Sequence, residues 1–331
     1  MKAAWYEALG SASEVLTVGE MPTPLPMPGE VLVRLVASGI NPSDVKKRAG
    51  WHGGSLDFPR IVPHSDGAGV IEAVGDGVPV DRRGQRVWVR NAQWERPWGT
   101  AAEYAALPSV LAVPLPDGVG FEEAACLGIP ACTAHVAVTG DGPVEGRTVL
   151  VQGGAGAVGF YAVQVAALSG ATVIATVSSP EKAAVARAGG AHHVIDYKHQ
   201  DVGAAVLALT DGAGVDHIVE VDLGANIATD AAMVKRRGSI AAYSSTSRPR
   251  FEFDYYGFGY KGVHLRFVQV YILSEAERRA AIDDLTRWMS AGQLRHRVAE
   301  TFPLRWIAEA HERQEAGVQG NVVVMCENQE V

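Results

Sequence analysis

Three glycines in the middle of the chain have the spacing of a turn that holds phosphate groups. Gly154, Gly156 and Gly159 follow a short apolar run and precede a segment with helical periodicity. In this G-x-G-x-x-G pattern the first glycine allows the tight turn, the second lets the backbone approach a pyrophosphate, and the third lets helix and strand pack closely. A helix N-terminus attracts negative charge, so we expect Ala157 and Val158 to contact the phosphates as well.

Strands and helices alternate regularly around these glycines. Strands are predicted at 148–152, 172–177, 193–196, 215–221 and 238–243, and helices at 158–169, 180–188 and 202–209. Such alternation predicts an α/β fold with a doubly wound parallel sheet, the Rossmann dinucleotide-binding architecture. The alternative is an α/β domain that binds no nucleotide, and the position of the glycine turn directly after the first strand argues against it.

The residues after the second predicted strand indicate which dinucleotide the fold takes. An acidic residue about twenty positions beyond the glycines usually holds the ribose of NAD, but this chain has Val177, Ser178 and Ser179 there. No carboxylate would repel a 2′-phosphate, and Ser178, Lys182 and Tyr197 can donate hydrogen bonds to one. The sequence therefore favours NADP(H) as the cofactor. Alternatively, Lys182 is a solvated helix residue and Tyr197 a packing residue.

Composition argues against several classes of protein. The chain has 331 residues, enough for about two domains, with 47% hydrophobic residues and a formal net charge of −8. No apolar run approaches the roughly 20 residues that span a bilayer, and the acidic balance gives no basic footprint for nucleic acid. The three cysteines form no C-x-x-C pair and are expected to be reduced. The N-terminus lacks the features of a secretory signal, so we expect a cytoplasmic protein.

The N-terminal part of the chain has a different pattern. Short strands are predicted at 31–37, 69–74, 86–89 and 103–107, separated by proline- and glycine-rich turns. After the nucleotide fold, a strand at 263–271 and an amphipathic helix at 276–289 lead into a tail of strand and helix pieces. We expect this tail to pack on the N-terminal, β-rich domain and a cofactor cleft to lie between the two domains.

Several motifs together resemble those of the medium-chain dehydrogenase/reductase superfamily, and within it the zinc-free, zeta-crystallin-like quinone oxidoreductases. Beside the glycine turn, the motifs are the segments 39–44, 65–75, 99–104 and 192–197. The resemblance covers nearly the whole chain. It implies a GroES-like catalytic domain formed by 1–122 and 265–331, a Rossmann domain at 123–264, and a homodimer.

The residues at the zinc-ligand positions differ from those of the zinc alcohol dehydrogenases of the same superfamily. By motif alignment, Asn41, Ser65 and Ile129 stand where those enzymes hold their catalytic zinc, and none is a usual zinc ligand. The segment 88–99 contains no cysteine for a structural zinc. We therefore predict no metal. A site of unusual composition, using His64, His52 or Asp66, is the alternative to ordinary core or surface roles for these side chains.

The loss of zinc predicts a change of substrate. Zinc stabilises the alkoxide formed when a simple alcohol is oxidised, whereas the charge that develops on a reduced quinone is delocalised and hydrogen bonds suffice. The resemblance thus implies an NADPH-dependent quinone oxidoreductase. One alternative is a reductase of 2-alkenals or enones. An alternative of another class is an NADPH-binding protein with a redox-sensing or structural role and little turnover.

The resemblance also implies roles for individual residues. Asn41 faces the nicotinamide and the substrate in relatives, although it also fits a turn before Pro42. Asp44 would orient this loop or cap the short helix after it, and His52 replaces a tyrosine common in the family as a possible donor. Further expected cofactor contacts are Thr133, Tyr243, Ser244, Phe267, Val268 and Asn321. The alternatives are packing roles for Thr133 and Phe267.

Overall fold

The structure is a computed structural model that describes residues 1–326, except for the side chain of His52. It divides into two compact units, one formed by Met1–Pro130 with Ile282–Val331 and the other by Ala131–Ala281. The predicted Rossmann segment, 123–264, falls mostly within the second unit. Its limits remain a prediction. None of the described helices is long and apolar enough to span a membrane.

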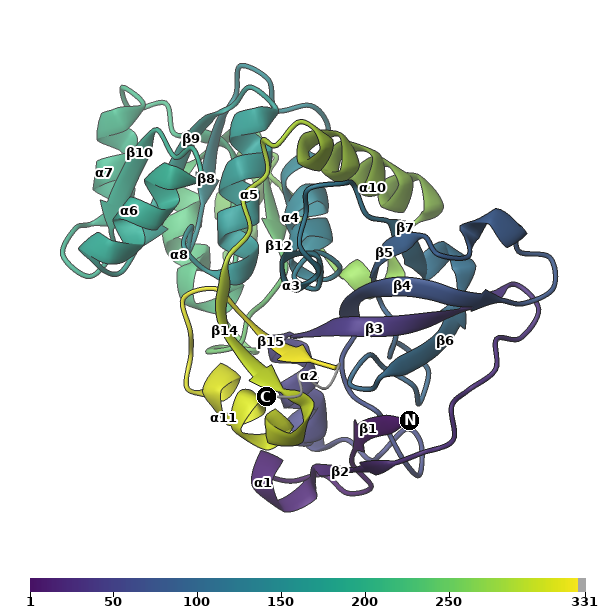
Figure 1. Ribbon diagram of the computed structural model, residues 1–331. Helices are drawn as coiled ribbons and strands as arrows, with labels where there is room; N and C mark the ends of the chain where they lie inside the picture. The colour runs from purple at the N-terminus through teal and green to yellow at the C-terminus, as the bar shows by residue number, and fades with distance from the viewer. Residues whose placement is uncertain (327–331) are drawn as a thin grey trace. The chain divides into compact units, whose positions relative to one another are not determined.

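The second unit contains a six-stranded sheet in which every neighbouring pair is parallel. The spatial order is β10 (His193–Asp196), β9 (Thr172–Val177), β8 (Thr148–Val151), β11 (Val215–Glu220), β12 (Val234–Ala242) and β13 (His264–Phe267). The chain starts at β8, moves outward to β10, and returns to β11 on the other side of β8 (Figure 1). This is the doubly wound order, so the predicted fold class is confirmed, and ligands of such sheets bind beyond the carboxyl ends near β8 and β11.

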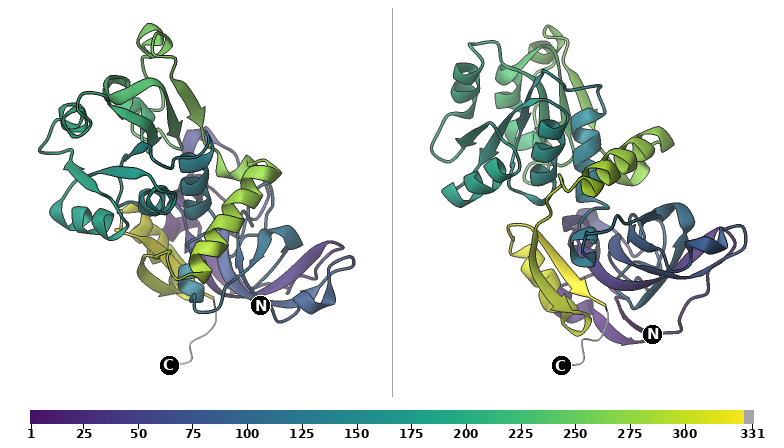
Figure 2. Two further views of the ribbon diagram at one scale, coloured as in Figure 1. Left: turned by 90° about the horizontal axis from the view of Figure 1, so that it is seen from above. Right: turned by 45° about the horizontal axis from the view of Figure 1, so that its top comes forward.

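Helices of the second unit pack around this sheet in two groups (Figure 2). One group contains α5 (Ala157–Leu168) and α6 (Pro180–Ala188), and the other α7 (Val202–Leu209) and α8 (Leu223–Met233). The start of α6 was predicted correctly: Ser179 Oγ accepts a hydrogen bond from the backbone N–H of Lys182, and Pro180 occupies the first turn. Helix α8 was not anticipated. The unit also holds α4 (Pro130–Thr139) and α9 (Tyr255–Gly259).

The core of the second unit comes from alternate residues of its strands. Leu150, Ile174, Ile218 and Ile240 are at most 1% exposed and belong to one apolar cluster. Because both faces of a parallel sheet are covered by helices, its strands are rich in β-branched residues on both sides. This packing holds the carboxyl ends of the strands, where the glycine turn begins, in a fixed arrangement.

The first unit is built on a mostly antiparallel sheet. Its strand order is β14 (Val298–Pro303), β15 (Asn321–Met325), β3 (Glu30–Ile40), β4 (Asp66–Val74), β5 (Arg86–Val89) and β7 (Ala112–Pro114), with β6 (Tyr104–Pro108) also paired to β3. The C-terminal strand β15 runs antiparallel to β3, with Val322 opposite Ile40. This pairing confirms that the tail returns to the N-terminal part of the chain.

Smaller elements complete the first unit. They are β1 (Lys2–Trp5), β2 (Thr17–Glu20), α1 (Ala12–Val15), α2 (Pro42–Arg48), α3 (Phe121–Ala124) and α11 (Ile307–Glu315). Helix α11 packs against both β15 and α2 (Figure 1). Arg48, at the end of α2, is fully buried and donates hydrogen bonds to the Gly10 carbonyl and to Glu315 of α11. The amphipathic helix predicted at 276–289 is α10 (Glu275–Ser290), which spans the division between the units.

Candidate active-site residues and dinucleotide-binding turn

The glycine turn has the geometry that its spacing predicts. A Cβ on Gly154 would lie 2.7 Å from the Ala175 side chain on β9, and one on Gly159 would lie 2.1 Å from the carbonyl oxygen of Gly153. Both positions therefore require glycine. Sequence reasoning missed Gly153, whose φ of +68° puts it in the left-handed region that favours glycine. Gly153 directly follows Gln152 at the carboxyl end of β8 and makes the bend.

The open side of the turn is the N-terminus of α5. Gly156 is the N-cap residue, and a Cβ there would meet only the Gly153 carbonyl oxygen, at 3.4 Å. Ala157 and Val158 are the first helical residues, and N–H groups at this position have no acceptor within the helix. Backbone donors and the helix dipole together favour a negatively charged group at this end. The turn thus fits the pyrophosphate of a dinucleotide.

Two predicted cofactor residues meet after β9, and the backbone of a third lies beside the end of that strand. The Lys182 ammonium donates a hydrogen bond to Ser178 Oγ over 2.9 Å, so serine and lysine form one polar site after β9. The backbone N–H of Tyr197 donates to the carbonyl of Val177, which puts Tyr197 beside the same strand end. The Tyr197 side chain is 50% exposed. One ammonium and two hydroxyl groups suit a phosphate better than they suit a bare ribose.

An acidic residue does lie near this site, at the end of β10. The Asp196 carboxylate accepts hydrogen bonds from the backbone N–H of Lys198 and from His199 Nδ1, at 3.0 and 2.9 Å. Hydrogen bonding to His199 lowers the pKa of Asp196. This carboxylate is already paired within its own loop.

The remaining cofactor residues of the second unit lie as predicted after the strands or on α4. Tyr243 and Ser244 follow β12, and Val268 follows β13 and donates its N–H to the Ala242 carbonyl. Phe267 is 72% exposed, so the alternative of a core residue is wrong for it. Thr133 is buried on α4. Their contact with a cofactor stays a prediction.

In the first unit, Asn41 is held between two buried carboxyl groups. Its backbone N–H donates to Asp44 Oδ2 over 2.8 Å, and its side-chain Nδ2 donates to Asp66 Oδ2 over 2.9 Å. Asn41 directly follows β3 and is the N-cap of α2, so the predicted turn role is also present. The two roles are compatible, because the side-chain amide is fixed by Asp66 while the backbone starts the helix.

Asp66 is the hydrogen-bond acceptor that Asn41 and Ile129 share. Sequence reasoning had treated Asp66 only as a structural residue or an alternative metal ligand. Its Oδ2 also accepts the backbone N–H of Ile129 at 2.8 Å, whereas its Oδ1 has no hydrogen-bond partner within residues 1–326. Burial raises the pKa of Asp66 to about 8, against the hydrogen bonds from Ile129 and Asn41, which lower it. Burial likewise raises the pKa of Asp44 to about 7. Both carboxyl groups therefore hold their protons to a higher pH than ordinary carboxyl groups do.

The residues that align with zinc ligands do come together. Asn41 and Ile129 both bond to the same oxygen of Asp66, and Ser65 directly precedes Asp66. Their side chains are an amide, a hydroxyl and an alkyl group, which is a poor donor set for zinc. Within residues 1–326, no three His, Cys, Asp or Glu side chains are grouped as metal ligands.

His64 is a core histidine rather than a metal ligand. It is fully buried, its Nδ1 lies 2.7 Å from Ser38 Oγ, and its Nε2 lies 2.8 Å from Nε2 of His311. Burial lowers the pKa of His64 to about 3. Ser38 also bonds to Thr100, whose hydroxyl donates to the carbonyl of Asp66. This chain of contacts anchors the segment that carries Asp66 to helix α11.

Asn321 and His52 are the remaining predicted site residues of the first unit. Asn321 begins β15, and its Nδ2 donates to the carbonyl of Arg297 over 3.1 Å. Its contact with phosphate remains a prediction. His52 belongs to a short 3₁₀ helix, Trp51–Gly53, and its side chain lies outside what the structure describes. Its proposed donor role is untested.

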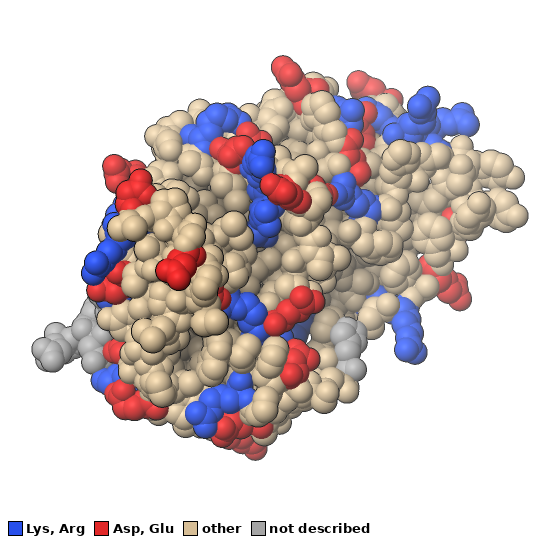
Figure 3. All heavy atoms as spheres, turned by 90° about the vertical axis from the view of Figure 1, so that its right-hand side faces the viewer, with Lys and Arg blue, Asp and Glu red and all other residues tan. Residues whose placement is uncertain are grey.

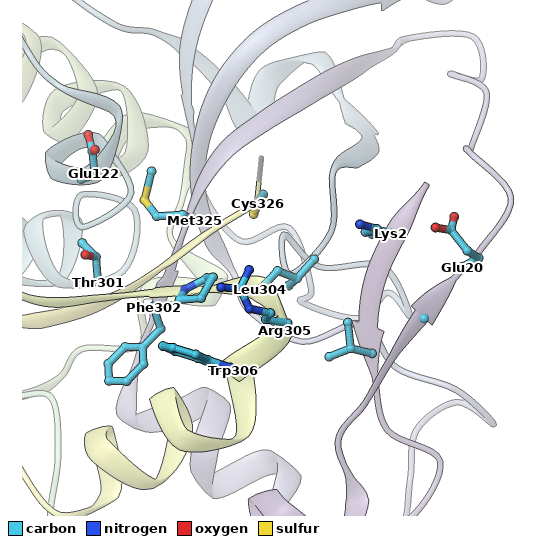
Figure 4. A pocket seen from close by; sticks show the side chains of 13 residues that line it. Lys2, Glu20, Glu122, Thr301, Phe302, Leu304, Arg305, Trp306, Met325 and Cys326 are labelled. Carbon is cyan, nitrogen blue, oxygen red and sulfur yellow. The ribbon is translucent and has the colours of Figure 1, made fainter. Parts of the chain in front are cut away.

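A separate cavity of about 550 Å³ lies in the first unit (Figure 4). Lys2, Glu20, Arg305, Trp306 and Cys326 are among its lining residues. None of the predicted catalytic residues lines it, so we assign it no part in the chemistry. On the molecular face in Figure 3, acidic and basic side chains are interspersed.

Comparisons with known proteins agree with this geometry. Two family models match: the alcohol dehydrogenase GroES-like domain over residues 27–117 and the zinc-binding dehydrogenase over residues 157–287. A quinone oxidoreductase of Pseudomonas aeruginosa is 32% identical over 302 residues, which cover 90% of this chain and 91% of that protein. The human quinone oxidoreductase is 28% identical, with 94% of each chain covered.

Solved structures give the same picture. An NAD-dependent alcohol dehydrogenase has a TM-score of 0.89 and 30% identity, covering 99% of this chain and 100% of its own. A mycobacterial protein complexed with NADPH has a TM-score of 0.85 and 30% identity, with 98% and 100% covered. A 2-haloacrylate reductase has a TM-score of 0.86 and 28% identity, with 99% and 100% covered.

The doubly wound sheet with its glycine turn, joined to a GroES-like β-rich unit, defines a medium-chain dehydrogenase/reductase. Within that superfamily, the chain belongs to the zinc-free quinone oxidoreductases. The predicted family is therefore confirmed.

Proposed function

We propose that the protein is an NADPH-dependent reductase of quinones that works without zinc. The observation that carries the cofactor assignment is the Ser178–Lys182 pair at the end of β9. The NADPH complex of a structural relative supports it. The quinone oxidoreductases of human and Pseudomonas aeruginosa support the substrate class.

NADPH supplies the hydride, and the protein supplies position and polar contacts. The Gly153–Gly159 turn and the N-terminus of α5 hold the pyrophosphate, while Ser178, Lys182 and Tyr197 hold the 2′-phosphate. Asn41 orients the reacting groups, because its side-chain amide is held in place by Asp66 and by the capping box that it forms with Asp44. An amide fixed before the substrate arrives costs little reorganisation during the reaction.

The buried carboxyl groups serve this positioning. Asp44 fixes the backbone of Asn41 and Asp66 fixes its side chain, so the amide has one orientation. A quinone suits such a site, because its developing charge is spread over a conjugated ring and needs no metal ion to stabilise it. A simple alcohol lacks that delocalisation and should be a poor substrate.

Steady-state kinetics test this proposal. NADPH oxidation is followed by absorbance with a panel of quinones and 2-alkenals, with NADH in parallel, and with and without a metal chelator. We expect turnover of quinones that prefers NADPH and resists the chelator. Turnover that the chelator abolishes and zinc restores would contradict the zinc-free mechanism. NADPH binding without turnover would support the alternative of a binding protein.

A reductase of activated double bonds is the second candidate. The likeness to a 2-haloacrylate reductase favours it. In that reaction hydride adds to the β-carbon and a proton follows. The substrate panel separates the two: faster turnover of 2-alkenals than of quinones would establish the second.

We also propose a homodimer that forms through the edge of the parallel sheet. In the part of the chain that the structure describes, strand β13 is paired only to β12, and Phe267 and Ile272 near this edge are 72% and 69% exposed. Unpaired edges readily accept a further strand. Light scattering should give twice the mass of the chain. A cytoplasmic location is proposed as well, to be checked by cell fractionation.

A further inference from the structure

A second pair of buried carboxyl groups is connected to the glycine turn by hydrogen bonds. Glu220 ends β11, Asp230 lies on α8, and both are fully buried. Each has one satisfied oxygen: Glu220 Oε1 accepts from Asn226 Nδ2 at 3.0 Å and from the Asp222 backbone, and Asp230 Oδ1 accepts from Gln152 Nε2 at 3.2 Å. Among the described residues, the other two oxygens, Glu220 Oε2 and Asp230 Oδ2, have no donor.

These two oxygens satisfy each other only if a proton lies between them. The two side chains are in hydrogen-bond contact, and two ionised carboxylates would both be acceptors and would repel each other. Burial raises the pKa of both groups, and the charge of Glu220 raises the pKa of Asp230 further. A protonated carboxyl group supplies the donor that these two oxygens lack.

The pair connects to the glycine turn by a directed chain of hydrogen bonds. Gln152 donates to Asp230 and accepts from the Thr176 hydroxyl, at 2.8 Å. Thr176 Oγ1 in turn accepts the backbone N–H of Gly153, at 2.9 Å. Gly153 is the left-handed residue that makes the bend. Each bond in the chain has a single possible donor, so the arrangement is fixed from the carboxyl pair to the turn.

We propose that Glu220 and Asp230 share one proton, and that this pair, through Gln152 and Thr176, is the positioning element of the dinucleotide-binding turn. The network crosses three adjacent strand ends, β11, β8 and β9, where doubly wound sheets bind their ligands. None of its side chains touches the cofactor. They act through Gly153, so their effect is on dinucleotide affinity rather than on hydride transfer. This inference rests on the proposed binding of NADPH.

The protonation state of the Glu220–Asp230 pair should make NADPH affinity depend on pH. Loss of the shared proton puts two charges side by side, breaks their hydrogen bond and frees Asp230, so NADPH affinity should fall as the pH rises through the raised pKa of the pair. Asp222 and Tyr243 also face the pair. Burial and then the charge of Asp222 raise the pKa of Glu220, and burial and then the charge of Glu220 raise the pKa of Tyr243. The charge of Asp222 therefore favours retention of the proton by the pair.

Two threonines of β9 provide the first test. Thr176→Val removes the link between Gln152 and Gly153 and should weaken NADPH binding about tenfold, the equivalent of one good hydrogen bond, with kcat unchanged. Thr176→Ser keeps the hydroxyl and should bind as the wild type does. Thr172→Val, at the exposed opposite end of the strand, is the matched control. Wild-type affinity in Thr176→Val would overturn the inference, whereas a wild type that binds no NADPH would overturn the proposed function instead.

The shared proton is tested by Asp230→Asn. An asparagine amide donates permanently to Glu220 and its carbonyl still accepts from Gln152, so this variant should bind NADPH with little dependence on pH. Infrared difference spectra of the protein without ligand should show a buried protonated carboxyl band in the wild type that Asp230→Asn removes. Asp216→Asn, at the other end of β11, should leave the band in place. An identical carboxyl band in wild type and Asp230→Asn would overturn the shared proton, whatever the protein binds.

Discussion

The glycine turn of the second unit and the Asn41 site of the first unit are built in different ways. The turn is made by backbone from a short stretch, Gly153–Gly159, and its donors are N–H groups at the start of α5. The Asn41 site is made by side chains from distant parts of the chain, since Asp66 joins Asn41 to Ile129. A site built from local backbone can be recognised from glycine spacing, whereas one built from distant side chains emerges only in the folded chain.

The largest expected effect is a loss of stability and of NADPH binding when the glycine turn is changed. Gly159→Ala places a Cβ within 2.1 Å of the Gly153 carbonyl, and such overpacking costs about 1–3 kcal/mol or more. Urea unfolding should show this loss, together with loss of NADPH binding. Gly156→Ala is the matched variant, because its Cβ meets nothing closer than 3.4 Å. Equal stability of the two variants would contradict the geometry of the turn.

A substitution at the Asn41 site should lower kcat. Asn41→Ala leaves Asp66 without its amide partner and the reacting groups without their fixed contact, so kcat should fall by about 100-fold, as for a misplaced catalytic contact. NADPH affinity should stay within a few-fold of wild type. Lys46→Ala on the same helix, whose ammonium lies over the Trp51 ring, should have wild-type kinetics. A fall in NADPH affinity with unchanged kcat would show that Asn41 belongs to binding alone.

Cofactor choice should depend on one ammonium group. Lys182→Ala removes the cation beside Ser178, and the preference for NADPH over NADH should fall about tenfold, the value of a charge-assisted hydrogen bond. NADH kinetics should not change. Lys198→Ala, in the loop after β10, serves as the control. An equal loss with both cofactors would place Lys182 away from the 2′-phosphate.

The last prediction concerns the pH dependence of stability. The folded-state pKa of Asp66, about 8, is raised from 3.8, so its contribution is fully present below the lower value and is lost as the pH rises through the higher one. Between these values the free energy of unfolding of the wild type should fall relative to Asp66→Asn by up to about 1.4 kcal/mol per pH unit. Urea unfolding of both proteins across this range measures the difference. Parallel pH profiles would mean that Asp66 is ionised in the folded protein.

Sequence reasoning predicted most of the second unit, because its signals are local. The strands at 172–177 and 193–196 and the helix at 202–209 have the predicted limits. Helix α8 (Leu223–Met233) was missed, because no clear capping signal separates it from strand β11. The left-handed Gly153 was also missed, because it lies just outside the recognised glycine pattern.

The candidate site was predicted less completely. Family motifs pointed to Asn41 and Asp44, but the role of Asp66 depends on its contact with Ile129, 63 positions away. The pairing of His64 with His311 spans 247 positions. Glu220 and Asp230 likewise gave no signal, because a shared proton depends on burial and on distance. Such contacts are set by tertiary packing and have no short-range pattern.

The central claim is hydride transfer from NADPH without metal, and a kinetic isotope effect on metal-free protein tests it most directly. The protein is treated with chelator, its zinc content is measured, and turnover of a quinone is compared with NADPH and with NADPH carrying deuterium at the transferred position. We predict full activity at negligible zinc content and a slower rate with the deuterated cofactor. Activity that disappears with the metal and returns with added zinc would contradict the account.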